Sequence, residues 1–157
     1  MPDMTNYTLN PQDSQDSFTK NLRDAYAHIP VIEDGLLDDD NDEILTYEDG
    51  SIKPFIVIWF QTPRRARRGR SFAGARLDQR IASADVIVVA RSGTEARRVM
   101  NSVIDTLIGF KPDGSGAVVE SDRQLWADAR QIDIKSRPSR WVMSYSVDWG
   151  IFSKKTA

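Results

Sequence analysis

The stretch that decides the fold is Asp85–Gly109, which reads DVIVVARSGTEARRVMNSVIDTLIG. It begins with a short, unbroken apolar run, Val86–Ala90, which predicts a strand covered on both faces. Ser92 and Glu95 follow with the spacing of a helix N-cap and the third helical residue. Apolar residues then recur at steps of three and four, which predicts a helix with one apolar face that ends at Gly109. A buried strand therefore leads directly into an amphipathic helix, and the apolar face of that helix must lie on a sheet.

The rest of the chain predicts one more helix and several strands. The helix is expected at about Pro11–Ala27, with Asn10 as its cap. Large side chains alternate along Arg140–Phe152, which is the period of a strand with one buried face. The other expected strands lie at residues 31–32, 55–60, 76–85, 117–119 and 129–134. Hairpin-linked strands with two helices predict an α+β domain: a mixed or mostly antiparallel sheet, two helices packed on one face, and long charged loops.

Length and composition place limits on the class of protein. The chain has 157 residues and no cysteine, which favours one domain and excludes thiol catalysis and disulfides. We expect a single domain over residues 11–157, preceded by a flexible N-terminal tail of residues 1–10. No apolar run approaches the roughly 20 residues needed to span a bilayer, and the polar N-terminus does not resemble a signal peptide. The sequence therefore predicts a soluble protein with no membrane partner.

No catalytic or metal centre is predicted. His28 is the sole histidine, and neither a nucleophile motif nor metal-ligand spacing surrounds it. Asp38, Asp40 and Asp42 match the first ligand positions of a calcium loop, but Glu43 stands where that loop needs glycine. We therefore expect no cofactor, no metal and no enzymatic activity.

The charge of the chain is segregated, although its net charge is only −2. An acidic segment, residues 33–49, holds nine acids and no base. An arginine segment, residues 64–76, holds six arginines and no acid. Such asymmetry between neighbouring segments indicates partners more than fold.

Three interpretations of the arginine segment stay open: a solvated loop, a nucleic-acid contact, and a contact with an acidic protein surface. In the third, the acidic segment of another copy is the partner, as in the head-to-tail interfaces that close into rings. The candidate basic residues are Arg64, Arg65, Arg67, Arg68, Arg70 and Arg76. The candidate acidic residues are Asp38, Asp39, Asp40, Asp42 and Glu43.

Over residues 18–152 the order of elements resembles the tail terminator proteins of long-tailed bacteriophages. The shared pattern begins with a short helix and a Pro-Val strand at Leu22–Ile32, followed by the very apolar strand Phe55–Phe60. A long hairpin then leads into the strand–helix unit Val86–Leu107, which matches V-x-V-x-A-x-S-x-x-E-A-x-x-V-x-x-x-V-x-x-x-L. An aromatic-rich strand, Trp141–Phe152, ends the pattern. Neither charged segment matches this family pattern.

The resemblance implies a structural virion protein without catalysis. It implies a homo-oligomeric ring, a hexamer, at the head-proximal end of the tail tube. Such a ring ends polymerisation of the tail tube protein, contacts the head-completion and connector proteins, and lets DNA pass. The implied location is the virion, after assembly in the host cytoplasm. A neck or head-completion protein is the nearest alternative, and a nucleic-acid-binding module that uses Arg64–Arg70 is another.

Overall fold

The computed structural model describes residues 11–34, 45–65, 79–124, 128–135 and 137–152, and its described part has the expected α+β architecture. Seven strands form one mixed sheet in the order β1-β2-β4-β7-β5, with β3 paired to β4 and β6 paired to β7. Only β1 and β2 are parallel. The elements in chain order are α1 (Pro11–Ala25), β1 (Val31–Glu33), β2 (Phe55–Phe60), β3 (Arg64–Arg65), β4 (Gln79–Ala90), α2 (Gly93–Leu107), β5 (Val119–Glu120), β6 (Arg130–Ile132) and β7 (Arg140–Phe152).

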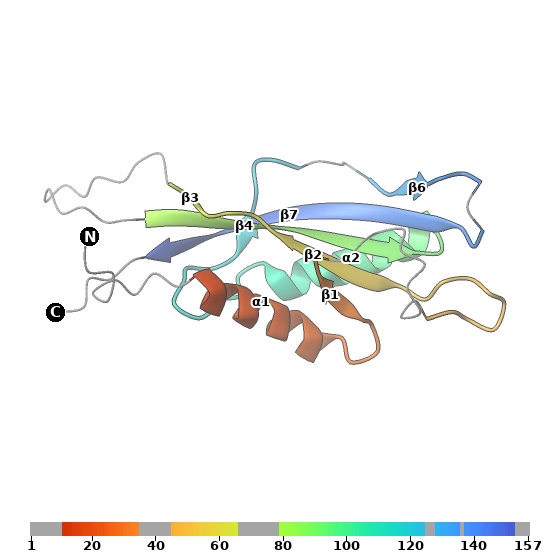
Figure 1. Ribbon diagram of the computed structural model, residues 1–157, viewed down its shortest axis with the longest axis horizontal. Coiled ribbons are helices and arrows are strands. Elements are labelled where there is room, and N and C mark those ends of the chain that lie inside the picture. The colour runs from red at the N-terminus through yellow and green to blue at the C-terminus, as the bar shows by residue number, and fades with distance from the viewer. Residues whose placement is uncertain (1–10, 35–44, 66–78, 125–127, 136, 153–157) are drawn as a thin grey trace, which may run out of the picture.

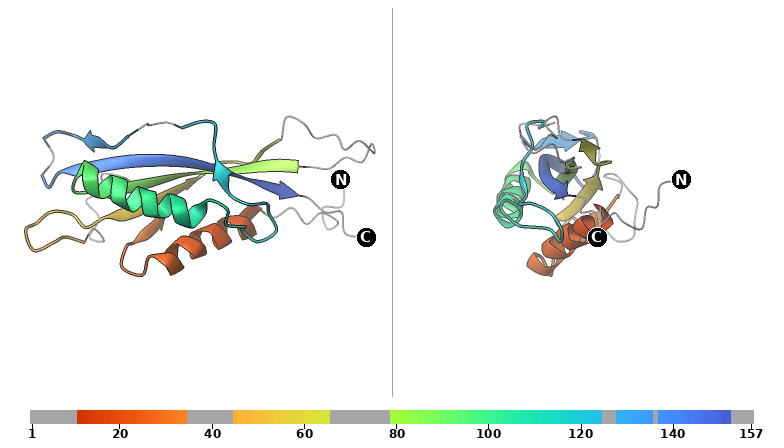
Figure 2. Two further views of the ribbon diagram at one scale, coloured as in Figure 1. Left: turned by 180° about the vertical axis from the view of Figure 1, so that it is seen from behind. Right: turned by 90° about the vertical axis from the view of Figure 1, so that its left-hand side faces the viewer.

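Both helices cover one face of the sheet, as predicted (Figures 1 and 2). Phe18 from α1 stacks on Trp149 of β7, with ring centroids 5.0 Å apart. Met100 and Leu107 of α2 are fully buried in the same cluster. We call this side of the sheet the helix face.

The opposite side of the sheet, which we call the outer face, carries a second and smaller apolar cluster. Val57, Val89 and Val142 are buried in it, although neither α1 nor α2 lies on that side. Ile52, from the hairpin of residues 45–53, and Ile132 of β6 pack against these strands. The chain itself therefore covers one end of the outer face. This explains how two helices suffice for strands that are apolar on both faces.

The helix α2 begins and ends where the sequence predicts. Ser92 is its N-cap, and the Ser92 hydroxyl accepts a hydrogen bond from the Glu95 amide at 3.2 Å. The Glu95 carboxylate does not return to the cap, because it pairs with Arg91 at 3.0 Å. Gly109 follows the helix with φ 88°, the left-handed conformation that glycine adopts at least cost.

Three local expectations need correction. The first helix ends at Ala25 rather than Ala27, and β3 was not predicted. The strand expected at residues 117–119 is β5, at Val119–Glu120, because the backbone of Val118 bonds to Gly109 and Phe110 after α2 instead of to β7. The strand expected at residues 129–134 is shorter, at Arg130–Ile132.

Two side chains form hydrogen bonds with backbone groups of the sheet. At β1, which is an edge strand, the Arg23 guanidinium donates to the Val31 carbonyl oxygen at 3.1 Å and 3.3 Å. On β7, between the segments that pair with β5 and β6, the Gln124 side-chain amide donates to the Ser146 carbonyl at 2.8 Å and accepts from the Ser146 amide at 3.0 Å. These contacts occupy backbone groups with which another strand could otherwise pair.

No helix in the described part of the chain is long and apolar enough to cross a membrane.

Candidate assembly surface

The centre of the outer face carries two adjacent serine–aspartate pairs. Ser83 of β4 lies opposite Asp148 of β7, and two positions along, Asp85 of β4 lies opposite Ser146 of β7. Each serine hydroxyl donates to the carboxylate across the strands, at 2.6 Å in the first pair and 2.5 Å in the second. The serine is on β4 and the aspartate on β7 in the first pair, and the reverse holds in the second pair.

A cation completes only the first pair. Arg64 of β3 donates to the Ser83 hydroxyl at 2.6 Å and to the second carboxylate oxygen of Asp148 at 3.1 Å. The second carboxylate oxygen of Asp85 instead accepts from the neutral amide of Gln61 at 3.1 Å. Within the described residues, Asp85 therefore has two neutral donors and no cationic partner.

Trp59 lies directly beside this carboxylate. It is the cross-strand partner of Asp85 in the β2–β4 ladder, so both side chains are on the outer face. Trp59 keeps 38% of its surface exposed, whereas the next residue, Phe60, packs on Phe18 and Trp149 on the helix face. A partly exposed tryptophan next to a carboxylate that has no cationic partner among the described residues is the most distinctive feature of the outer face. We call these two residues, with Gln61 and Ser146, the Trp59–Asp85 surface.

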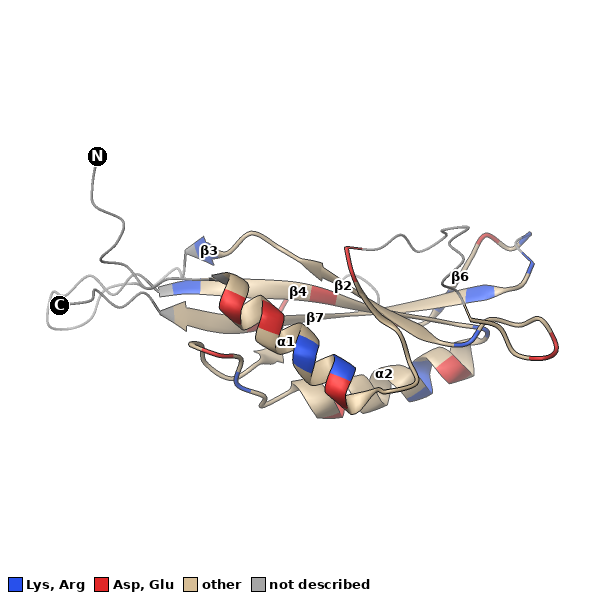
Figure 3. Ribbon diagram, turned by 60° about the horizontal axis from the view of Figure 1, so that its bottom comes forward, with Lys and Arg blue, Asp and Glu red and all other residues tan. Residues whose placement is uncertain are grey.

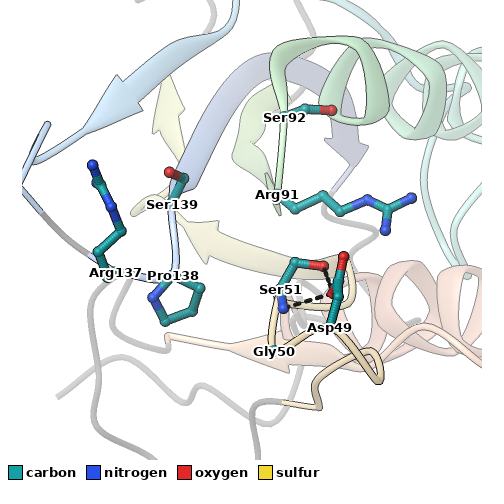
Figure 4. Close-up of a pocket in the computed structure, with 8 residues that line it drawn as sticks. All are labelled: Asp49, Gly50, Ser51, Arg91, Ser92, Arg137, Pro138 and Ser139. Atoms are coloured by element: carbon teal, nitrogen blue, oxygen red, sulfur yellow. Dashed lines mark hydrogen bonds between the residues drawn. The ribbon is translucent and has the colours of Figure 1, made fainter.

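A second candidate is an open cavity of about 710 Å³ where the 45–53 hairpin meets the start of α2 (Figure 4). Ser51 donates to Asp49 from its amide and its hydroxyl at 2.9 Å and 2.5 Å, and these bonds lower the pKa of the Asp49 carboxyl, with a smaller contribution from Arg91. The other lining residues are Gly50, Ser92, Arg137, Pro138 and Ser139.

The arginines of this cavity do not form a binding site for an anion. Arg91 lies over the Tyr47 ring, 4.3 Å from its centroid, and pairs with Glu95. In Figure 4 the side chains of Arg91 and Arg137 do not point toward one another. The geometry therefore assigns no ligand to the cavity.

Of the predicted basic residues, Arg64 has its partners within its own chain, and Arg65 pairs through its backbone with Arg80 in the β3–β4 ladder. Figure 3 shows these basic positions at one end of the sheet, with an acidic hairpin tip at the other end beside further basic residues. Arg67, Arg68, Arg70, Arg76, Asp38, Asp39, Asp40, Asp42 and Glu43 lie outside the described residues. The contact expected between the two charged segments therefore stays a prediction.

His28 is exposed in the turn after α1. In the described part of the chain, no group of three or more His, Asp or Glu side chains is arranged to hold a metal ion.

Sequence reasoning missed the Trp59–Asp85 surface. A weak signal was present, because Ser83 and Asp85, and Ser146 and Asp148, are polar residues two apart within otherwise apolar strands. Residues two apart share a face of a strand, but only the register shows that the two sets lie opposite one another.

Comparison with known proteins assigns no family. No protein-family model matches the chain, and no curated protein matches it. A solved structure of a protein without a descriptive name is similar over 91% of this chain and 96% of its own, with 12% identity and a TM-score of 0.43. A likeness at this level carries no argument about function.

Proposed function

We propose that the protein is a structural component of a bacteriophage tail, a tail terminator that assembles into a hexameric ring on the tail tube. The observation that carries the proposal is the order of elements. A helix, a short Pro-Val strand, the apolar strand β2, the long β4–α2 unit and the aromatic-rich β7 follow one another as the family resemblance requires. The ring would end tube polymerisation and present a surface to the head-completion proteins.

Two features of the molecule support assembly through side chains. Arg23 and Gln124 occupy backbone groups of β1 and β7 with which another strand could pair, so strand addition at those positions is disfavoured. The segregated charge and the Trp59–Asp85 surface are different patches of one chain, and unlike patches that meet between copies make a head-to-tail interface. Head-to-tail interfaces close into rings when the rotation between copies permits.

The test is to produce the protein together with the tail tube protein of the same phage. We expect electron micrographs to show a ring at one end of each tube, and native mass spectrometry to give a closed oligomer. A protein that stays monomeric and never joins tubes would contradict the proposal. A ring located in the neck of intact particles, away from the tube end, would identify a head-completion protein instead.

A further inference from the structure

We propose that the Trp59–Asp85 surface receives an arginine side chain from the arginine segment of a second copy of this chain. The inference deepens the proposed function, on which it rests for the presence of a second copy. It starts from the contrast between the two serine–aspartate pairs: Asp148 has a guanidinium, and Asp85 has none within the described residues.

The Ser83–Asp148 pair, which binds Arg64, shows how a guanidinium could bind the Asp85–Ser146 pair. Arg64 donates one nitrogen to the Ser83 hydroxyl and another to the Asp148 carboxylate. Asp85 and Ser146 present the same two acceptors in the adjacent register position. The Gln61 side chain donates to the Asp85 carboxylate oxygen to which a guanidinium would bind. Because Gln61 is exposed, its side chain can rotate into solvent and release that oxygen. An incoming arginine would replace a neutral hydrogen bond with a charge-assisted one, which is about twice as strong.

Trp59 favours arginine over other cations. A planar guanidinium stacks on an indole face and can still donate sideways to a carboxylate, whereas an ammonium group is a strongly hydrated point charge. The 38% exposure of Trp59 leaves part of its ring available beside Asp85.

The geometry of the β3–β4 hairpin favours a second copy as the source. The arginine segment begins in β3, which ends at Arg65, and β4 begins at Gln79. Asp85 is six residues farther along β4, roughly 20 Å at the rise of a strand. Within one copy, the Arg64 contacts with Ser83 and Asp148 lie between Gln79 and Asp85 along β4.

The first test is peptide binding to the full-length chain. The receptor carries Arg67→Ala, Arg68→Ala, Arg70→Ala and Arg76→Ala, so that its own segment cannot compete, and the probe is a peptide of residues 64–76. We expect calorimetry at low salt to show binding that Asp85→Asn weakens about tenfold and Trp59→Leu about three- to fivefold. A peptide with lysine in place of arginine should bind more weakly than the native peptide.

Two control substitutions test whether the loss of peptide affinity is specific to the Trp59–Asp85 surface or follows from removing any exposed charge or apolar side chain. Asp105→Asn removes an exposed carboxylate from α2, and Ile134→Ser removes a side chain that is 76% exposed after β6. Neither should change peptide affinity. Circular dichroism checks that every variant is folded. Equal affinity for the receptor with and without Asp85→Asn and Trp59→Leu would overturn the inference.

A mixing experiment tests the second copy. One variant keeps the surface and has the four arginines replaced by alanine; the other keeps the arginines and carries Trp59→Leu with Asp85→Asn. We expect neither to associate alone and the mixture to form a one-to-one complex in sedimentation. A mixture that remains monomeric while the peptide binds would show that the arginine comes from the same copy, which overturns the proposal.

The two proposals fail in different ways. If the wild-type chain forms rings on tail tubes and the Asp85 and Trp59 variants form them equally well, the surface is not the interface, while the proposed function stands. If the wild-type chain never joins tubes but peptide binding depends on Asp85, the proposed function fails and the arginine-binding surface stands.

Discussion

The two faces of the sheet are stabilised differently. On the helix face, α1 and α2 bury a continuous apolar cluster that includes Phe18, Met100 and Trp149. On the outer face, the described part of the chain covers an apolar cluster at one end, and the centre carries serines, carboxylates and a partly exposed tryptophan. The difference indicates that the helix face contributes most of the apolar stabilisation, whereas the centre of the outer face is polar.

The largest expected difference in unfolding free energy is between alanine substitutions of Trp149 and Trp59. Trp149→Ala removes a buried ring that contacts Phe18 and Phe60 and whose indole N–H donates to Ser14 at 3.1 Å. We expect it to cost about 3–5 kcal/mol of unfolding free energy. Trp59→Ala, on the outer face, should cost less, about 2 kcal/mol, because 38% of the residue's surface is already exposed to water. Urea unfolding measures both, and equal losses would contradict the division between the faces.

A matched pair of adjacent valines compares the two apolar clusters. Val88 belongs to the helix-face cluster and Val89 to the outer cluster, and both are fully buried. We expect Val88→Ala and Val89→Ala each to cost about 2 kcal/mol, because the hairpin and β6 close the outer cluster as completely as the helices close the other. A much smaller loss at Val89, again in urea, would show that this cover is loose.

Charge reversal in the arginine segment should weaken assembly rather than folding. We expect Arg67→Glu with Arg68→Glu to weaken self-association about tenfold in sedimentation while the urea midpoint stays unchanged. A second reversal identifies the acceptor. Asp85→Arg should restore association in part, whereas restoration by lysines at Asp38, Asp40 and Asp42 would identify the acidic segment as the partner.

The smallest expected losses of stability are those of asparagine substitutions at Asp148 and Asp85. Asp148→Asn should cost about 1 kcal/mol, since it removes the charge that pairs with the partly exposed Arg64. Asp85→Asn should cost less, because its described partners are neutral and the asparagine oxygen can still accept from Ser146. A larger loss at Asp85 in thermal unfolding would mean that its charge has a partner within the same copy.

The sequence was a good guide wherever the signal is local. The strand Phe55–Phe60, the N-cap Ser92 and the stop at Gly109 were predicted correctly, because apolar periodicity, a capping hydroxyl and a left-handed glycine act within a few residues. The boundaries of β5 were wrong because Val118 bonds to the turn after α2. The role of Arg64 was also missed, because its partner Asp148 is 84 residues away.

The sequence by itself therefore determined the α+β framework, the two ends of α2 and the segregation of charge. Only the tertiary structure decided which carboxylates have a cation. That choice depends on the register of β4 against β7, which places Ser83 opposite Asp148 and Asp85 opposite Ser146. A shift of one residue would move each of these side chains to the other face of the sheet. The packing of both faces sets that register, and no stretch of sequence contains it alone.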